Sequence, residues 1–151
     1  IPVYPVRGQL LIFEVKERFL SCPVIVGGAH ESYYLGPKPD GLYAGTTLEE
    51  AGFDTACTEE ALGRIGDEVG QLAPITLELP VKGSWAGLRP ATRDKLPILG
   101  QAPGWDNLFI ATGHFRKGVL LAPLTGQVMS ELILTGKTAF PLDDFSPGRF
   151  V

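Results

Sequence analysis

Two arginines stand in the sequence where a positive charge needs a partner. Arg89 follows the stretch Trp85–Leu88 and precedes Pro90, a setting too apolar for a solvated surface. A guanidinium there requires a carboxylate, which another part of the protein or a bound ligand can supply. Arg116 lies beside the expected start of a helix, where a cation gains nothing from the helix dipole. The two arginines indicate either a site for a small anion or structural ion pairs, and both interpretations stay open.

A loop bracketed by glycines separates a predicted strand from a predicted helix. It runs from Thr112 to Gly118 and follows the short apolar stretch Leu108–Ala111. The first N–H groups of a helix have no partner within it and carry partial positive charge. The backbone around Gly118–Leu121 can therefore hold an anion, or a ring oxygen that gains negative charge. Many strand-to-helix loops bind nothing, so a plain connection is the alternative.

The remaining candidate side chains also have two interpretations. Tyr33 and Tyr34 alternate on a predicted strand, so one faces a core or cavity and the other faces away. His114 can act as an acid or a base, although a lone histidine in a glycine loop is more often a hydrogen-bonded structural group. Cys22 and Cys57 lack a flanking cation, so both are expected to be buried or inert. The sequence has no nucleophile elbow, phosphate-binding loop or metal-ligand cluster.

The elements that position these residues begin with strands. Strand-forming residues occupy 9–15 and 23–26, and the segments 32–35 and 42–47 predict a hairpin. The turn of this hairpin carries Pro39-Asp40-Gly41, which combines a preset φ with a permissive glycine.

Two helices are predicted. The first begins after the N-cap Thr58 and ends before Pro74, and its buried face consists of Leu62, Ile65, Val69 and Leu72. The second ends near Gly136 and carries a stripe made of Leu121, Leu124, Val128 and Leu132. Proline is tolerated in a first helical turn and costs about 3 kcal/mol deeper inside, so Pro123 predicts a start at 120–122.

Between the helices, the alternation in residues 75–79 predicts a strand that residues 81–88 extend. Glycine at 19 and proline at 13 of 151 positions make the chain rich in turns. The pattern as a whole predicts an α+β fold.

Composition excludes several classes of partner. The net charge is −4 and no run of Lys or Arg occurs, so binding to nucleic acid or an anionic membrane is not expected. No apolar stretch is expected to reach the roughly 18 residues that a membrane span needs. With two cysteines and no signal peptide, a cytoplasmic location is expected. The chain starts with Ile1 inside a strand-like segment, which predicts a fragment.

A long series of ordered residues resembles a known family. The series comprises Trp85-Ala86-Gly87-Leu88-Arg89-Pro90, Thr92, Asp94, Pro97-Ile98-Leu99-Gly100, Asn107-Leu108, Ala111-Thr112-Gly113-His114-Phe115-Arg116, Gly118, Leu121-Ala122-Pro123 and Thr125-Gly126. Upstream it continues with Val6-Arg7-Gly8-Gln9, Tyr34-Leu35-Gly36-Pro37-Lys38, Gly41 and Gly45-Thr46-Thr47. These residues resemble the C-terminal portion of the glycine oxidase branch of the D-amino-acid oxidase family, whose members are FAD-dependent and include the oxidase of thiamine biosynthesis.

The resemblance implies a division of the chain. Residues 1–92 correspond to most of an antiparallel-sheet substrate domain, and residues 93–151 to the last strand and helix of a Rossmann-like FAD domain. The glycine fingerprint that grips the FAD pyrophosphate is absent, which implies a missing N-terminal FAD-binding portion. The sequence leaves the oligomeric state open, and a homo-oligomer is possible.

The resemblance also implies roles for single residues. Arg89 corresponds to the arginine that binds the substrate carboxylate, and Tyr34, Arg116 and Leu48 correspond to other residues at the substrate. The predicted flavin-contacting residues are Gly113, His114, Phe115, Arg116, Lys117, Gly118, Val119 and Leu120. In this family, hydride passes from the substrate Cα to flavin N5 without an obligatory side-chain base, so no catalytic residue is predicted. Oxygen then reoxidises the flavin and forms peroxide.

Departures from the family pattern leave the substrate open. Lys117 stands where asparagine is usual, Lys38 where arginine is usual, and Leu48 where methionine can form the pocket wall. Glycine, sarcosine and D-amino acids all remain candidates. Two other functions are also compatible with the sequence: a dehydrogenase that passes electrons to another acceptor, and a non-catalytic module that binds small carboxylates or protein partners.

Overall fold

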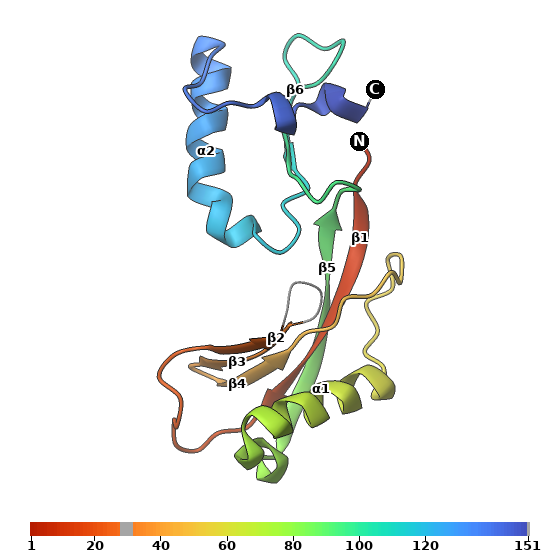
Figure 1. The fold of residues 1–151 in the computed structure, drawn as a ribbon, viewed down its shortest axis with the longest axis vertical. Helices are drawn as coiled ribbons and strands as arrows, with labels where there is room; N and C mark the ends of the chain where they lie inside the picture. The colour runs from red at the N-terminus through yellow and green to blue at the C-terminus, as the bar shows by residue number, and fades with distance from the viewer. Residues whose placement is uncertain (28–31, 151) are drawn as a thin grey trace. The chain divides into compact units, whose positions relative to one another are not determined.

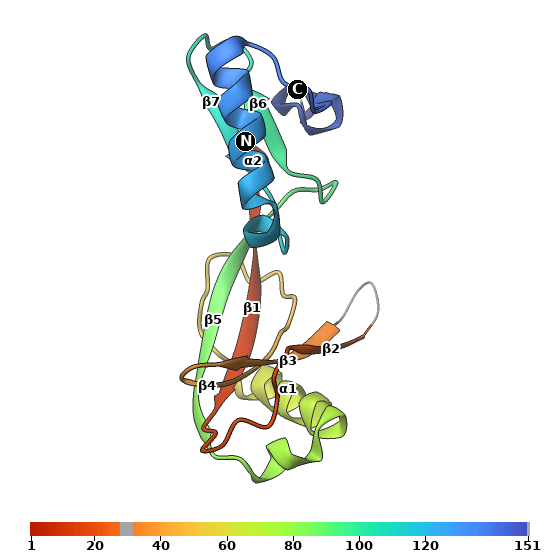
Figure 2. The same cartoon turned by 90° about the vertical axis from the view of Figure 1, so that its left-hand side faces the viewer.

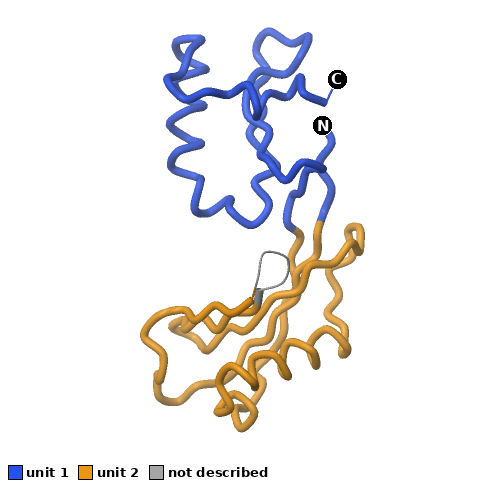
Figure 3. The backbone as a smooth tube through the Cα atoms, viewed as in Figure 1, with its two compact units in different colours: residues 1–5, 89–151 blue, residues 6–88 orange. Residues whose placement is uncertain are grey.

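The computed structural model describes residues 1–27 and 32–150, which fall into two compact units. One unit is continuous and comprises residues 6–88. The other combines residues 1–5 with residues 89–151 (Figures 1 and 3). The continuous unit is therefore inserted into the chain of the other.

A five-stranded sheet organises the unit of residues 6–88. The strands, two of which run on into the other unit, are β1 (Tyr4–Phe13), β2 (Val24–Gly27), β3 (Ser32–Lys38), β4 (Gly41–Gly45) and β5 (Val81–Ala91). Their order is β2-β3-β4-β1-β5, and the pairs β2/β3, β3/β4 and β1/β4 are antiparallel. Lys38 pairs with Gly41, so only two residues turn the hairpin. The predicted hairpin is confirmed.

Helix α1 (Glu59–Leu72) covers one face of this sheet, as Figures 1 and 2 show. Thr58 is the N-cap, and its side chain accepts a hydrogen bond from Ala61 N. The predicted stripe is confirmed: Ile65 and Val69 are fully buried, with Leu62 and Leu72 packed at the edge. From the sheet, this core receives Leu11, Phe13, Tyr33, Leu35, Leu42 and Ala44.

The prediction of a strand at residues 75–79 is wrong. Pro74–Glu78 form a 3₁₀ turn, and β5 begins only at Val81. Proline at the first helical position favours this turn, and Thr76 closes it by donating from its hydroxyl to Ala73 O at 2.8 Å. A strand would bury the apolar residues Ile75 and Leu77 and expose Thr76. The structure shows the reverse, because Thr76 is buried and Leu77 is 68% exposed.

The second unit is built around a two-stranded antiparallel sheet and a long helix. Its elements are β6 (Ile98–Gln101), β7 (Phe109–Thr112), α2 (Gly118–Thr135) and the 3₁₀ turns Asp143–Phe145 and Pro147–Phe150. Figure 2 shows α2 alongside β6 and β7. The core of this second unit consists of Ile98, Ala102 and Ile110, against which Val3 and Phe150 pack. β7 agrees with the predicted strand, whereas β6 was not predicted.

Helix α2 begins earlier than Pro123 predicts. It starts at Gly118, which places Pro123 at the sixth helical position. The reason is that Lys117 N bonds His114 O and Leu121 N bonds Lys117 O, so the loop leads directly into the helical ladder. Pro123 has no N–H to donate to Val119 O, and the helix continues without that bond. At the other end, Gly136 is a left-handed C-cap with φ of 72°, as expected.

The expectation that no apolar stretch is long enough to cross a membrane is also wrong. By length and composition, the 18 residues of α2 satisfy that requirement, and most of the helix is not buried within the described residues. Core helices of soluble proteins pass the same test, so one such helix is weak evidence for a membrane segment.

We expect Ile65→Ala to lower the free energy of unfolding by about 2–5 kcal/mol, because it leaves a cavity between α1 and the sheet. Urea denaturation followed by circular dichroism measures this change. Arg64→Ala, on the exposed side of the same helix turn, is the control and should change stability by less than about 0.5 kcal/mol. Equal effects of the two substitutions would contradict the assigned core.

Candidate functional site

The glycine-bracketed loop is attached to the end of β5. Phe115 N donates to Pro90 O at 3.0 Å, so the loop lies against the residue that follows Arg89. Arg89 itself is half-buried, and Arg116 is exposed. The structure thus brings the predicted carboxylate-binding arginine and the predicted flavin loop into one region of the same unit.

Gly113 is a position that only glycine suits. Its φ is 77°, and a Cβ there would lie 2.7 Å from Thr92 Cγ2. Thr92 is fully buried and donates from its hydroxyl to Leu96 O at 2.8 Å. The close packing of Gly113 on Thr92 fixes where the loop leaves β7. Phe115 also has a left-handed backbone, with φ of 51°, which turns the chain toward α2.

An ion pair holds the turn that carries Thr92. Arg149 Nε donates to Asp94 Oδ2 at 2.7 Å, and Asp94 Oδ1 accepts from Leu96 N at 3.1 Å. The hydrogen bond from Arg149 holds the pKa of Asp94 well below its usual range, so the carboxylate stays charged. The Arg149–Asp94 ion pair therefore links the turn of residues 92–96, on which Gly113 packs, to the C-terminal segment of the described chain.

His114 links the loop to α2. Its Nε2 lies 2.9 Å from Thr125 Oγ1, and burial lowers the pKa of the ring, which favours the neutral imidazole. Thr125 is neither an acid nor a base at physiological pH. The contact supports the structural interpretation of His114.

The N-terminus of α2 can accommodate a flavin ring edge. Lys117 is the N-cap and makes no side-chain capping bond, and the first ladder bond comes from Leu121 N. The N–H groups of Gly118, Val119 and Leu120 precede that ladder and can donate to ring oxygens. Val119 and Leu120 are 95% and 79% exposed, so apolar surface lies next to these donors. A flavin ring has an edge with oxygen acceptors and an apolar ring surface. N–H donors next to apolar side chains are suited to both.

The other predicted substrate residues belong to the unit of residues 6–88. Tyr33 is buried in the core under α1, and Tyr34 is half-buried on the opposite face of the sheet. Tyr34 lies over Gly36, where a Cβ would be 3.2 Å from Tyr34 Cε2. Leu48 follows β4 and is 36% exposed. Tyr34 and Leu48 are thus separated by unit from Arg89 and residues 113–120, and their roles stay predictions.

A buried polar network was not predicted as a functional element. Arg7 and Gln9 lie on β1 with almost no exposed surface, and their side chains donate to Glu49. Burial alone would raise the pKa of Glu49, but hydrogen bonds from Thr47, Arg7 and Gln9 outweigh burial and lower it. The sequence signal for this network is Arg7, a charged residue within an apolar strand, which requires a buried partner. The sequence alone does not identify Glu49 as that partner.

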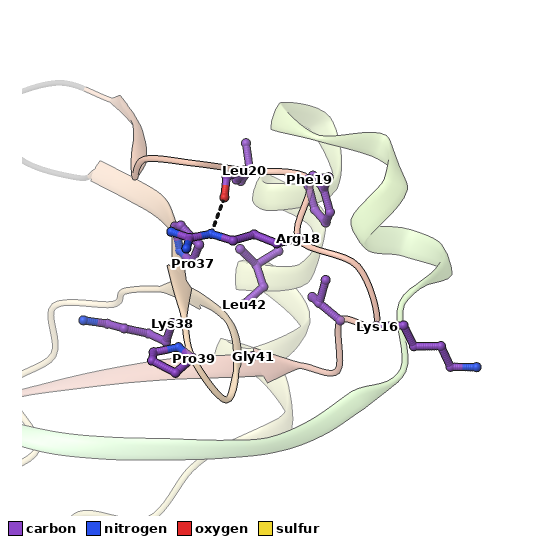
Figure 4. A pocket seen from close by; sticks show the side chains of 10 residues that line it. Lys16, Arg18, Phe19, Leu20, Pro37, Lys38, Pro39, Gly41 and Leu42 are labelled. Atoms are coloured by element: carbon purple, nitrogen blue, oxygen red, sulfur yellow. Dashed lines mark hydrogen bonds between the residues drawn. The ribbon is translucent and has the colours of Figure 1, made fainter.

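A separate cavity of about 320 Å³ lies beside the β3–β4 turn (Figure 4). It is lined by Val15, Lys16, Arg18, Phe19, Leu20, Pro37, Lys38, Pro39, Gly41 and Leu42. Arg18 Nε donates to Leu20 O at 2.9 Å. The lining contains none of the predicted substrate or flavin residues.

The two cysteines are free thiols. Cys57 is half-buried and Cys22 is exposed, so burial does not account for the expected inertness of Cys22, which stays a prediction. Among the described residues, no cluster of His, Cys, Asp and Glu could hold a metal ion.

A family model described as FAD-dependent oxidoreductase matches residues 1–132. The chain belongs to this family of FAD-dependent oxidoreductases. It is 38% identical over 148 residues to a glycine oxidase from Pseudomonas putida, with 97% of this chain and 39% of the relative covered. The resemblance to glycine oxidases is thereby confirmed, and FAD is the cofactor of the family.

Solved structures confirm the α+β fold with antiparallel sheets. Glycine oxidase from Geobacillus kaustophilus superposes with a TM-score of 0.86 at 33% identity, covering 97% of this chain and 39% of that one. L-proline dehydrogenase from P. horikoshii gives a TM-score of 0.89 at 27% identity, covering 99% and 41%. The chain therefore spans about two fifths of the length of these relatives.

We expect Gly113→Ala to lower the free energy of unfolding by about 1–3 kcal/mol or more, because it adds both left-handed strain and a collision with Thr92. Thermal unfolding checks this value. Gly104→Ala is the matched control, since Gly104 has the same φ of 77° and no atom within 4 Å. Thr92→Ser removes the Cγ2 methyl and should partly rescue Gly113→Ala; no rescue would show that the collision is not the cause.

Proposed function

We propose that this chain forms the substrate-binding part and the flavin-edge part of a FAD-dependent amino-acid oxidase. The reaction is oxidative deamination of glycine, sarcosine or a D-amino acid, with formation of peroxide. The observation that supports it best is the hydrogen bond from Phe115 N to Pro90 O, which joins the predicted flavin loop to the strand end beside Arg89 in a member of this family.

In this proposal, Arg89 binds the substrate carboxylate. A guanidinium presents two parallel N–H donors to a carboxylate, which fixes orientation as well as charge. Tyr34 and Arg116 assist at the carboxylate end, and Leu48 limits the space for the substrate side chain. These residues orient the substrate Cα, and orientation can contribute much of the rate when no side-chain base takes part.

In this proposal, the first N–H groups of α2, at Gly118, Val119 and Leu120, would hold the oxygen-bearing edge of the flavin ring. Bound FAD supplies the hydride acceptor for amine oxidation. Positive charge at a helix N-terminus stabilises negative charge that develops on a neighbouring oxygen. Neutral His114 keeps the loop in place through Thr125 and needs no proton of its own for the reaction.

We further propose that the chain acts within a longer flavoenzyme in the cytoplasm. Residues 1–92 would supply most of the substrate domain and residues 93–151 the C-terminal part of the FAD domain. The glycine fingerprint for the FAD pyrophosphate does not occur in these 151 residues, so another segment of the protein has to carry it.

A dehydrogenase is the second candidate. The superposition on L-proline dehydrogenase, with a TM-score of 0.89 at 27% identity, supports it. The higher identity to glycine oxidases, 33% for the solved structure and 38% for the Pseudomonas putida relative, favours the oxidase. Peroxide production in air distinguishes the two, because only an oxidase passes its electrons to oxygen.

We expect the visible flavin band of the longer protein to bleach on anaerobic addition of glycine, sarcosine or D-alanine. Arg89→Ala should raise the apparent dissociation constant of the reacting substrate by at least about 30-fold, with flavin content unchanged, because the carboxylate loses its charged partner. Arg93→Ala, at an exposed arginine four residues away, is the control and should leave binding unchanged.

A protein that retains no flavin would refute the oxidase and dehydrogenase proposals together and leave the carboxylate-binding module. Loss of flavin in Arg89→Ala with unchanged substrate affinity would assign Arg89 to the cofactor instead.

A further inference from the structure

The pairing of β1 continues beyond the end of β4, with a change of register. Leu10 pairs with Gly45, and further along an isolated antiparallel bridge joins Arg7 to Glu49. Arg7 and Leu10 are three positions apart, whereas Gly45 and Glu49 are four apart. One extra residue is therefore inserted after β4, which makes this segment a β-bulge.

The bulge decides which way Leu48 faces. Tyr34, Gly45 and Leu10 are direct cross-strand neighbours and share one face of the sheet, here named the Tyr34 face. Arg7 and Gln9 alternate with Leu10, so they lie on the face that α1 covers. The contact of Gln9 Nε2 with the N-cap Thr58 agrees with this, at 3.3 Å.

Because Glu49 pairs with Arg7, its side chain also lies on the α1 face, where the Thr47 hydroxyl bonds it. Strand alternation then places Leu48, between these two residues, on the Tyr34 face. Without the extra residue, position 48 would pair with Arg7, and the leucine would face α1. The bulge thus gives Leu48 the same face as Tyr34.

Charged hydrogen bonds hold this register. Glu49 Oε2 accepts from Arg7 Nε at 3.0 Å and from Arg7 Nη2 at 2.6 Å. Gln9 Nε2 donates to Glu49 Oε1 at 2.9 Å, and the Thr47 hydroxyl donates to the same oxygen. The backbones of Arg7 and Glu49 bond each other in both directions, at 2.8 and 3.0 Å.

The residue before Leu48 is anchored as well. Gln9 N donates to Thr47 Oγ1 at 2.9 Å. Both neighbours of Leu48 are therefore fixed to β1, while Leu48 itself keeps an exposed surface. Arg7 is buried, so removing the charge of Glu49 leaves Asp54, at 2.7 Å, as the one charged partner of its guanidinium among the described residues.

We propose that Glu49, paired with Arg7, is a positioning residue that keeps Leu48 on the Tyr34 face and thereby sets the size of the substrate side chain that the site accepts. The inference rests on the proposed function, in which Leu48 and Tyr34 contact the substrate. Glu49 acts through Leu48 and does not touch the substrate.

The test uses the complete FAD-loaded protein and the unreactive ligands acetate, propionate and butyrate. Their dissociation constants are measured from the change that each causes in the flavin spectrum. In the parent protein, affinity should fall with each added methylene. In Glu49→Gln, whose amide places N–H groups against the donors of Arg7 and Gln9, the acetate-to-butyrate affinity ratio should shrink about 3- to 10-fold. Thr47→Val, which removes the hydroxyl between Gln9 and Glu49, should shift the ratio in the same direction.

A double-mutant cycle separates positioning from general destabilisation. Leu48→Ala should also shrink the ratio, and Glu49→Gln added to Leu48→Ala should change it by less than about 2-fold, because both substitutions act on one wall. Glu50→Gln, the same charge change at the exposed next residue, is the matched control and should leave the ratio unchanged.

Equal weakening of all three ligands in Glu49→Gln would overturn the proposal and indicate a structural role only. Additive effects of Glu49→Gln and Leu48→Ala would overturn it too. If the parent protein binds none of the three carboxylates, the proposed function is refuted. If it binds them but Glu49→Gln leaves the acetate-to-butyrate affinity ratio unchanged, only the role of Glu49 is refuted.

Discussion

The hydrogen bond between Phe115 N and Pro90 O is the point on which the candidate site depends. It holds the loop that follows β7 against the end of β5. The start of α2, three residues after Phe115, is positioned by this contact. Gly113 can approach Thr92 only because it has no Cβ, and the left-handed turn at Phe115 directs the chain into α2. The free N–H groups of α2 are useful only in this location, since a helix dipole acts over about one turn.

The sequence was sufficient where a local signal determined the structure. Thr58, the apolar stripe behind it and Pro74 defined α1, and the Pro39-Asp40-Gly41 turn defined the β3–β4 hairpin. It failed where a local pattern had two physical meanings. Residues 75–79 alternate like a strand, yet Pro74 and the hydroxyl of Thr76 stabilise a 3₁₀ turn. Pro123 suggested a later start for α2, but a helix that begins in a preformed turn tolerates one missing bond.

The Arg7–Glu49 network could not be predicted, because its partners are 42 residues apart and the register depends on a bulge. From composition, Arg7 is only a charge within an apolar strand, and any acidic residue could have been its partner. The candidate site shows the same limit. Residue types and family resemblance indicated Arg89, Tyr34 and the loop, whereas the anchoring of that loop by Thr92, Asp94 and Arg149 emerged only from the structure.

The inserted arrangement of the two units has a consequence for the order of folding. The unit of residues 6–88 uses contacts within one continuous stretch, so it can form as soon as that stretch has been synthesised. In the other core, Val3 and Phe150, which are far apart in the sequence, both pack against the cluster of Ile98, Ala102 and Ile110. Such distant contacts are slow to close because the loop entropy must be overcome first. The unit of residues 6–88 shortens the effective loop, because the chain enters it through β1 and leaves it through β5, which are neighbours in one sheet. Once that sheet has formed, the segments before and after the unit start close together, and closing the other core costs less loop entropy.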